Sequence, residues 1–379
     1  MLKLHDTEAP AKKGFLVSVW DKQIDKIEAQ SLERELLGLT STLGLVIAGQ
    51  ELVHVREKQP KYGMGSGKAQ ELADKAAALN ADCLVFNFEL GPSQQRNWEE
   101  LAKIPAVDRQ ELIIKIFADR AVTREAELQV KLAQLVYSLP RLSHKYIDLS
   151  RQRGGRYGTR GAGETLLETD RRQVEQKIQK LEKELKSVQK QRQIQRKQRE
   201  RQGFPVCAIV GYTNAGKSSL LNAMTGADVL VEDKLFATLD ATTRRLDLST
   251  PEWSGKPVLL VDTVGFIRRL PHSLIKAFRS TLEEAALADL LIHVLDASEP
   301  DIESFYQTTN SVLGELGAQN VPVITVLNKI DRVDDSVLEN LLSRFPGSTA
   351  ISVKDGKGLA ELKLQIGIHV PSQLNLNRV

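Results

Sequence analysis

The sequence predicts an α/β protein in which a domain with a mostly parallel sheet and helices on both faces is preceded by a small α/β domain and an antiparallel helical hairpin. Three observations support this prediction. Short apolar runs alternate with Ala-, Glu- and Lys-rich helical segments up to residue 119, two helical stretches with one apolar seam each follow, and strand-loop-helix units repeat after residue 202. We therefore expect domains at residues 1–119, 120–202 and 203–370, and a short tail at 371–379.

The composition excludes disordered and fibrous proteins. Of the 379 residues, 41% are hydrophobic and 27% are charged, which is enough apolar material for more than one core. The 52 Lys and Arg nearly balance the 49 Asp and Glu, so any basic surface must be local. The two cysteines, Cys83 and Cys207, lie in apolar runs, as buried thiols of a cytoplasmic protein do. No apolar stretch approaches the ~18 residues of a membrane span.

Three apolar runs predict strands in the first domain, at residues 15–19, 43–47 and 83–86. Residues 63–68 (GMGSGK) resemble a phosphate-binding loop, but no apolar strand precedes them. We interpret this segment as the turn that opens a helix, and an anion site is the less favoured alternative.

The second domain contains two helical stretches whose apolar residues recur every three or four positions, so that the helices can pair along their seams. The seam residues are Leu128, Leu132, Leu135 and Leu139 in the first stretch and Val174, Ile178, Leu181, Leu185 and Val188 in the second. The tip between them, residues 151–165, combines five glycines with arginines and a tyrosine. Such a tip is either a solvated linker or a contact to nucleic acid.

The second hairpin helix carries a strong local charge. Residues 171–202 contain twelve Lys or Arg against four Glu, which leaves a net charge of +8. Charged helix faces are usually just solvated, but a one-sided excess repels itself unless an anionic partner neutralises it. RNA is a partner of suitable chemistry.

A phosphate-binding loop follows the strand predicted at residues 206–210. Residues 211–218 read GYTNAGKS, which is the P-loop pattern between a strand and a helix. In such a loop the backbone N–H groups surround the phosphates, Lys217 reaches the β and γ oxygens, and the Ser218 hydroxyl ligates Mg²⁺. The sequence therefore predicts a nucleoside triphosphate site with Mg²⁺.

Further segments follow in the order that a guanine-nucleotide switch requires. An apolar strand ends in DTVG, where Asp262 can hold Mg²⁺ through water and the Gly265 N–H can bind the γ-phosphate. The strand at 323–327 delivers NKID, in which Asp331 can accept two hydrogen bonds from guanine. Adenine lacks these donors, which disfavours a plain ATPase. Residues 350–354 end another strand, where a backbone N–H can meet guanine O6.

A loop rich in hydroxyl groups, residues 235–244, is the candidate for the first switch segment. One of its hydroxyls should ligate Mg²⁺ when the γ-phosphate is present. Residue chemistry alone does not choose between Thr238, Thr242 and Thr243.

Taken together, these segments resemble the HflX family of ribosome-associated GTPases. The resemblance rests on the segments FATLD (236–240), DTVGF (262–266), GAGET (161–165) and ETDRR (168–172), with shorter matches at QQRN (94–97), VDR (107–109) and LPRL (139–142). It implies that Thr238 is the Mg²⁺ ligand. It also implies a GTPase whose hairpin reaches the large (50S) ribosomal subunit and its rRNA, and which separates stalled ribosomes or acts in protein synthesis or ribosome biogenesis.

The expected site residues follow from these motifs and from the resemblance. The residues expected to contact GTP or GDP are Gly211, Tyr212, Thr213, Asn214, Ala215, Gly216, Lys217, Ser218, Phe236, Ala237, Thr238, Leu239, Asp240, Asp262, Thr263, Val264, Gly265, Asn328, Lys329, Ile330, Asp331, Ser352, Val353 and Lys354. Lys217, Thr238, Gly265 and Asn214 are expected to act in hydrolysis, and Ser218 and Thr238 to ligate the metal.

Two residues bear on the hydrolysis rate. Phe266 stands where many GTPases place a glutamine that orients the attacking water, so we expect slow turnover without the ribosome. Asn214 is similar to the asparagine of potassium-activated GTPases, and its alternative role is only to cap the loop. We expect a monomer in the cytoplasm, free or associated with ribosomes or membranes. The alternative function is an RNA-binding maturation factor that uses GTP only as a timer.

Overall fold

The computed structural model describes residues 12–144, 162–227, 234–248, 256–269, 271, 274 and 284–370. The chain forms two compact units. Unit 1 comprises Met1–Asp119 and Leu132–Lys180, and unit 2 comprises Arg120–Lys131 and Leu181–Val379. The predicted tail and most of the predicted hairpin tip lie outside the described residues.

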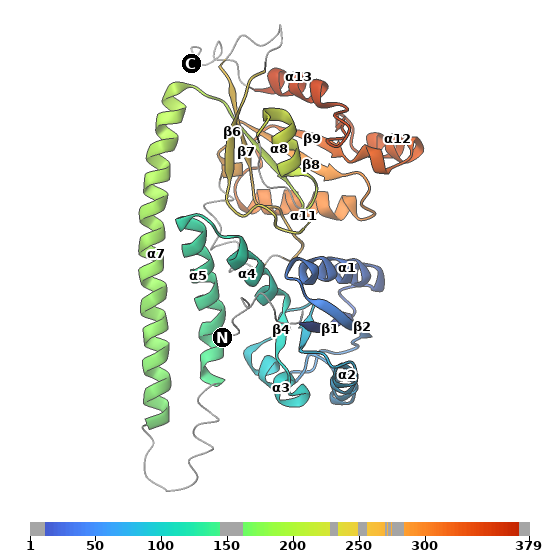
Figure 1. Cartoon of the computed structure of the whole chain (residues 1–379), viewed down its shortest axis with the longest axis vertical. Helices are drawn as coiled ribbons and strands as arrows, with labels where there is room; N and C mark the ends of the chain where they lie inside the picture. The colour runs from blue at the N-terminus through green and yellow to red at the C-terminus, as the bar shows by residue number, and fades with distance from the viewer. Residues whose placement is uncertain are drawn as a thin grey trace. The chain divides into compact units, whose positions relative to one another are not determined.

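Unit 1 contains a four-stranded parallel sheet in the order β2-β1-β3-β4. Its strands are β1 (Lys13–Trp20), β2 (Val46–His54), β3 (Cys83–Phe86) and β4 (Ala106–Asp108). Its helices are α1 (Lys26–Thr42), α2 (Ser66–Ala78), α3 (Pro92–Ala102) and α4 (Arg109–Arg120). Figure 1 shows α1 on one face of the sheet and α2 and α3 on the other, as right-handed crossovers in both directions from β1 require.

The second strand of this sheet differs from the prediction at residues 43–47. Leu43 caps α1 instead, and Gly44 follows with a φ of 69°, so the strand begins only at Val46. β2 is an edge strand and is half-exposed along most of its length, so it has no continuous apolar run for sequence reasoning to find. β4 is only three residues long and was not predicted.

Unit 2 contains a six-stranded sheet in the order β10-β9-β8-β5-β7-β6, in which only β6 is antiparallel to its neighbour. Its strands are β5 (Val206–Gly211), β6 (Thr242–Leu246), β7 (Val258–Asp262), β8 (Leu290–Asp296), β9 (Val323–Asn328) and β10 (Thr349–Ala350). The predicted fold class, a mostly parallel α/β sheet preceded by a smaller α/β domain and paired helices, is confirmed.

Helices cover both faces of this sheet (Figure 1). They are α8 (Lys217–Thr225), α11 (Ile302–Glu315), α12 (Asp335–Arg344) and α13 (Leu359–His369). One buried cluster joins α8 and α13 to the central strands, and a second joins α11 and α12 to the ends of β8 and β9. The phosphate loop therefore leaves the centre of a sheet that is packed on both sides.

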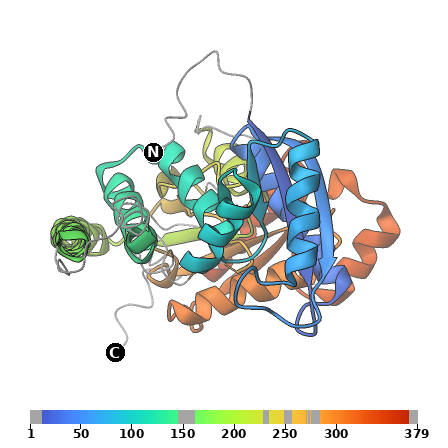
Figure 2. The same ribbon diagram turned by 90° about the horizontal axis from the view of Figure 1, so that it is seen from below.

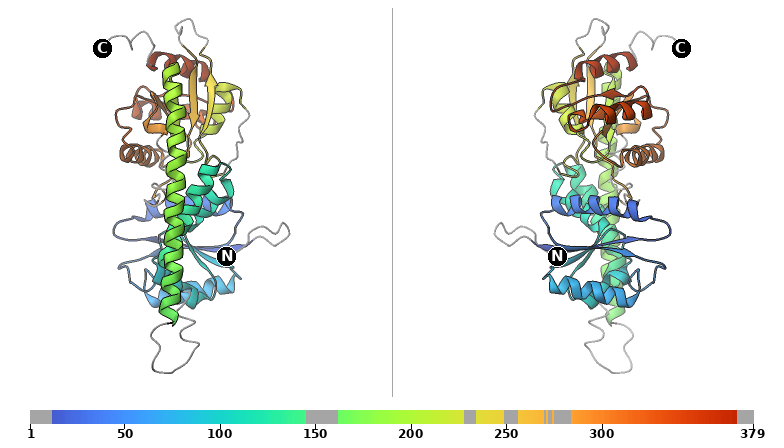
Figure 3. Two further views of the ribbon diagram at one scale, coloured as in Figure 1. Left: turned by 90° about the vertical axis from the view of Figure 1, so that its left-hand side faces the viewer. Right: turned by 90° about the vertical axis from the view of Figure 1, so that its right-hand side faces the viewer.

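The helical stretches form α5 (Arg124–Ser138), the 3₁₀ turn η1 (Leu139–His144) and α7 (Ala162–Gln202). α7 is an uninterrupted helix of 41 residues, drawn upright in Figure 3 and seen almost along its axis in Figure 2. It begins inside the segment predicted as loop, because residues 162–165 already adopt helical backbone. Among the seam residues, Leu128 and Leu185 are the most deeply buried, at 1% and 6% exposure.

The start of α5 pairs with α7 within unit 2. Arg124 contacts Glu184 at 3.0 Å, and Arg192 contacts the buried carboxylate of Glu125 at 2.8 Å. Arg192 also lies 3.9 Å from Glu284. Arg192, one of the twelve cations counted above, is therefore a structural ion-pair partner within unit 2.

Candidate nucleotide-binding site

The phosphate loop connects β5 to α8. Gly211 ends β5 with a φ of 145°, and a Cβ at this position would collide with the carbonyl oxygen of Val294 on β8. The loop then continues through Asn214 with a φ of 62° to Gly216, and α8 begins at Lys217. The N-terminus of α8 consequently faces the space that the loop encloses, which is the arrangement that favours anions.

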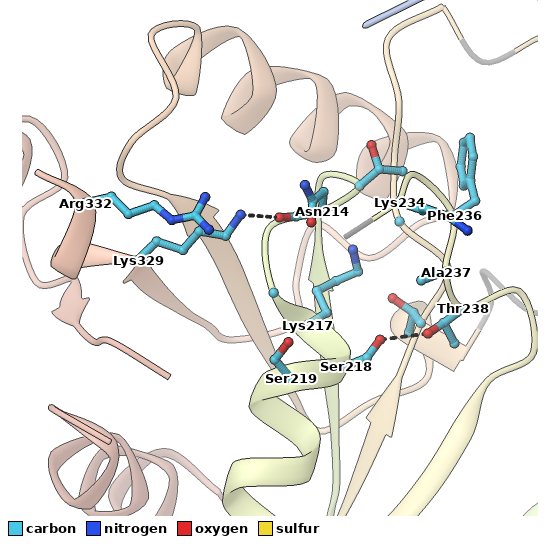
Figure 4. A pocket seen from close by; sticks show the side chains of 14 residues that line it. Asn214, Lys217, Ser218, Ser219, Lys234, Phe236, Ala237, Thr238, Lys329 and Arg332 are labelled. Carbon is cyan, nitrogen blue, oxygen red and sulfur yellow. Dashed lines mark hydrogen bonds between the residues drawn. The ribbon is translucent and has the colours of Figure 1, made fainter. Parts of the chain in front are cut away.

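A cavity of about 250 Å³ lies at this loop, and Figure 4 shows the side chains around it. Eleven residues expected at the site line it: Thr213, Asn214, Gly216, Lys217, Ser218, Phe236, Ala237, Thr238, Thr263, Gly265 and Lys329. Thr263 and Gly265 complete the wall on the side of β7. Segments that are more than 100 residues apart in sequence thus share one pocket.

Lys217 lies inside the loop and is buried, with 6% of its surface exposed. Its Nζ donates a hydrogen bond of 2.7 Å to the Tyr212 carbonyl oxygen. Burial lowers the pKa of Lys217 to about 8, whereas the nearby Asp262 carboxylate raises it. A bound phosphate would add negative charge beside this ammonium and would therefore favour its protonated form.

Three oxygen-bearing side chains converge beside Lys217. The Ser218 hydroxyl lies 2.7 Å from the Thr238 hydroxyl and donates to Asp262 Oδ2 at 2.6 Å. Asp262 is fully buried and, among the described residues, its Oδ1 has no hydrogen-bond partner. Burial raises the pKa of this carboxyl, and Lys217 and Ser218 lower it. Hard oxygen donors with one unsatisfied buried carboxylate oxygen fit a Mg²⁺ ion.

The structure separates the three threonines that sequence chemistry left equivalent. Thr238 lies next to Ser218 (Figure 4), whereas Thr242 and Thr243 belong to β6 and pair with β7 opposite Asp262 and Val261. β6 was not predicted, because four of its five residues, TTRRL, are polar and it lies at the sheet edge.

The second half of the site is built on the end of β9. Asn328 Nδ2 donates to the Ala215 carbonyl oxygen at 2.9 Å, and Lys329 Nζ donates to the Asn214 carbonyl oxygen at 2.8 Å. Lys329 also pairs with Asp296 at 2.6 Å. The Asn-Lys pair therefore fixes the phosphate loop relative to β9.

Asp331 is held from the other side by Ser352. The Ser352 hydroxyl donates to Asp331 Oδ1 at 2.8 Å, and this hydrogen bond lowers the pKa of the Asp331 carboxyl. The Val353 N–H donates to Asn328 Oδ1 at 3.3 Å. Strand β10 ends at Ala350, so these residues lie in the turn that follows it and not in the strand that was predicted.

The segment after β7 runs directly against the phosphate loop. The Phe266 N–H donates to the Gly211 carbonyl oxygen at 3.1 Å, and the Thr213 N–H donates to the Phe266 carbonyl oxygen at 2.8 Å. The Phe266 ring is buried at 1% exposure. A Cβ on Gly265 would lie 2.9 Å from both Lys217 Nζ and Thr213 Cα, so only glycine allows this approach.

Some expected residues lie elsewhere and some lining residues were missed. Leu239 is buried at 2% exposure and does not line the cavity, and the Asp240 carboxylate accepts hydrogen bonds from Thr123. Ser219, Lys234 and Arg332 line the cavity but were not expected. Each lies next to a motif that was recognised, and that adjacency was the only signal available.

The second glycine-rich segment opens a helix, as its interpretation predicts. α2 begins at Ser66, after Gly65. Lys68 pairs with Glu51 at 3.1 Å and with Glu71 at 2.8 Å, so two carboxylates neutralise the only basic side chain of that segment.

The shorter sequence matches, at residues 94–97, 107–109 and 139–142, contact one another around Arg141 in unit 1. The Arg141 guanidinium donates to Gln95 Oε1 at 2.7 Å and to the Leu90 carbonyl oxygen at 2.8 Å, and it lies 3.4 Å from Asp108. It also stacks 3.5 Å above the Tyr137 ring centre. These matches thus mark a contact that ties η1 to α3 and β4.

The fold and the site define the class: unit 2 contains a P-loop GTPase domain, in which the phosphate loop, the switch threonine and Lys329 of the guanine-type NKID motif line one cavity. Three family models match the chain. They are described as GTP-binding GTPase N-terminal at residues 30–118, GTP-binding GTPase Middle Region at 120–199, and 50S ribosome-binding GTPase at 206–329.

The chain is also similar to proteins named GTPase HflX along almost its full length. It is 48% identical to GTPase HflX of Akkermansia muciniphila, covering 96% of this chain and 85% of that protein. It is 42% identical to GTPase HflX of Escherichia coli, covering 95% and 83%. A crystal structure of SsGBP with GDP is 25% identical with a TM-score of 0.50, covering 94% and 97%. The chain belongs to the HflX family of GTPases and is a GTP hydrolase.

Proposed function

We propose that this GTPase binds the large ribosomal subunit and its rRNA through the helical hairpin and uses GTP to separate stalled ribosomes. The observation that carries this proposal is covalent continuity: α7 ends at Gln202 and the phosphate-loop strand begins at Val206, so only three residues separate them. The 41 residues of α7 span about 60 Å at 1.5 Å per residue. The family model that matches residues 206–329 is described as a 50S ribosome-binding GTPase, which supports the partner.

GTP and GDP are bound in the cavity at the phosphate loop by the residues that the sequence singles out. Lys217 replaces its bond to the Tyr212 carbonyl with one to the β- and γ-phosphates, and the Gly265 N–H binds the γ-phosphate. Asp331 accepts hydrogen bonds from guanine, and the turn at 352–354 lies within reach of guanine O6. Leu239 and Asp240 support this site from outside the cavity.

Ser218 and Thr238 would hold Mg²⁺, and the Asp262 carboxylate would act on it through water. The unpartnered Asp262 oxygen supports this assignment. When bound, the ion supplies positive charge at the β- and γ-phosphates. We expect Ser218→Ala to abolish the Mg²⁺ dependence of GTP-analogue affinity, with Thr225→Val, at the other end of α8 and outside the cavity lining, as the control. An unchanged Mg²⁺ titration in Ser218→Ala would reject the assignment.

Hydrolysis by the isolated protein is slow, on the order of 10⁻⁴ to 10⁻² s⁻¹, because the buried Phe266 ring cannot orient water. The large subunit accelerates it by ordering the switch segments. K⁺ binding near Asn214 is a further element of the proposal. Equal hydrolysis rates with and without large subunits would reject acceleration by the subunit. Equal hydrolysis rates in K⁺ and Na⁺ would reject the K⁺ site.

The function is tested with intact ribosomes and the protein loaded with a non-hydrolysable GTP analogue. Sedimentation should show free subunits, whereas unchanged monosomes would reject splitting and leave a maturation factor. GDP-loaded protein is the control. In the described residues no helix is long and apolar enough to span a membrane. We propose a monomer that works in the cytoplasm.

A further inference from the structure

We propose that Asp240 is a positioning residue that couples the GTP-bound state of the switch threonine to the first turn of hairpin helix α5. The inference rests on the proposed role of Thr238 and goes beyond it, because it assigns the carboxylate two residues later a partner outside the nucleotide site. All residues that carry it belong to unit 2.

The Asp240 carboxylate accepts three hydrogen bonds at the start of α5. Oδ2 accepts from the N–H groups of Val122 and Thr123, at 3.3 and 3.1 Å, and Oδ1 accepts from the Thr123 hydroxyl. These groups lie 117 residues or more from Asp240 in sequence. A negative charge at a helix N-terminus is favourable, because it faces unpaired N–H groups and the positive end of the helix dipole.

Thr123 is itself the N-cap of α5. Its Oγ1 accepts from the Ala126 N–H at 3.2 Å, and its carbonyl oxygen accepts from the Glu127 N–H at 2.9 Å. The hydroxyl therefore serves two partners at once: it caps the helix as an acceptor and binds Asp240 as a donor. Any displacement of Asp240 therefore changes the hydrogen bonding of Thr123, the residue at which the helix starts.

Only one residue separates Thr238 from Asp240, so the two side-chain contacts are closely linked along the chain. Thr238 contacts Ser218 in the metal cluster, and Leu239, buried at 2% exposure, separates it from Asp240. β6 then begins at Thr242 and pairs with β7. Two residues span at most about 7 Å, so Thr238 cannot move far toward or away from a metal ion without moving Asp240.

An ion pair connects the start of α5 to the second hairpin helix, α7. Glu125, in the first turn of α5, is buried and pairs with Arg192 of α7. α5 continues from unit 2 into unit 1 at residue 132, and α7 crosses between the units at residue 181. By linkage, if GTP strengthens the Asp240 contact, the contact strengthens GTP binding by the same factor.

The test compares affinities of the purified protein for GDP and for a non-hydrolysable GTP analogue in Mg²⁺. Asp240→Asn and Thr123→Val should each weaken GTP-analogue binding about fivefold, the scale of one net hydrogen bond, and leave GDP binding unchanged. The double variant should be no weaker than either single variant, and Thr123→Ser should restore wild-type affinity. Asp247→Asn, an exposed carboxylate on the same chain segment, is the matched control.

Hydrogen exchange at residues 122–126 supplies a second readout. The GTP analogue should protect these amides more than GDP does in the wild type, but not in Asp240→Asn. If the variants weaken GDP and GTP-analogue binding equally, Asp240 has a merely structural role and the proposal is overturned. Hydrogen exchange at residues 122–126 that is the same with both nucleotides would also overturn it. Thr238→Ala distinguishes the proposed role of Thr238 from its proposed coupling to α5. If Thr238→Ala weakens binding of the GTP analogue while Asp240→Asn does not, only the coupling is wrong. If Thr238→Ala leaves this binding unchanged, the assigned role of Thr238 fails.

Discussion

At the residue scale, a hydrogen bond between two turns orients the carboxylate that we propose reads guanine. Asp331 follows β9 and Ser352 follows β10, and these strands are neighbours in the parallel sheet. The Ser352 hydroxyl holds the Asp331 carboxylate in one orientation and keeps its pKa low. The carboxylate is therefore charged and oriented before a base arrives, which reduces the cost of binding.

Asp331→Asn should reverse the base preference. An amide cannot accept both guanine donors, so GTP affinity should fall by about 10²-fold or more, while affinity for the xanthine nucleotide should rise. Competition between the two nucleotides against a fluorescent analogue measures this. Ser352→Ala, which frees the carboxylate and removes the acceptor of the Asp355 N–H, should lower GTP affinity a few-fold. An Asp331→Asn variant that still prefers GTP would contradict this role.

His293 makes unit 2 sensitive to acid. It is fully buried in β8 and stacks on Tyr306, and in the described part of the chain neither ring nitrogen has a hydrogen-bond partner. Burial lowers the pKa of His293 to about 3 from 6.5. Between these values the unfolded chain binds a proton that the folded chain does not, so folding stability is lost as the pH falls below about 6.5.

His293→Phe should remove this dependence and keep the ring stacking. Between pH 7.5 and pH 5.5 protonation of the unfolded histidine should lower the free energy of unfolding of the wild type by about 1.4 kcal/mol. The Phe variant should lack this contribution. Urea unfolding at both pH values, followed by circular dichroism, measures the difference. His369→Phe on the exposed end of α13 is the control. Identical pH dependence in His293→Phe and the wild type would refute the assignment.

At the element scale, Arg141 fastens the end of α5 and η1 to the sheet of unit 1. Its planar guanidinium satisfies Gln95, the Leu90 carbonyl and Asp108 together, and Asp108 is fully buried. Burial raises the pKa of Asp108, whereas Arg141 lowers it. A lysine carries the charge but not the fork of donors.

Arg141→Lys should destabilise unit 1 by about 1–3 kcal/mol, because buried acceptors lose their donors. Denaturant unfolding followed by the fluorescence of Trp98, which is fully buried in this unit, reports the change. Arg171→Lys, at an exposed pair on α7, should change stability by less than about 0.5 kcal/mol. Equal effects of the two substitutions would show that the fork is unimportant.

At the scale of the whole molecule, sequence reasoning recovered what depends on local order and missed what depends on distant partners. The phosphate loop and NKID are continuous patterns with one physical meaning each. β2 and β6 were misplaced or missed because edge strands need no apolar run. The Asp240 and Arg141 contacts could not be foreseen, because no spacing rule connects residues that only folding brings together.

Ribosome binding should depend on salt if the exposed cations of α7 contact RNA phosphates. Replacing Lys186 and Lys190 with Gln should weaken binding and reduce the slope of log affinity against log salt by about 0.7–0.9 per contact removed. Lys26→Gln on α1 is the control, and GTP affinity should stay constant in both. Slopes that match the wild type would place the RNA contact elsewhere.

Both cysteines of the chain, Cys83 and Cys207, are buried, and burial raises the pKa of both thiols. A thiol reagent needs an accessible thiolate, so the native protein should stay almost unlabelled by maleimide at neutral pH. A single cysteine introduced at an exposed position of α7 would then carry the only dye. The molecule is thus already suited to single-site fluorophores that follow the long helix through a nucleotide cycle.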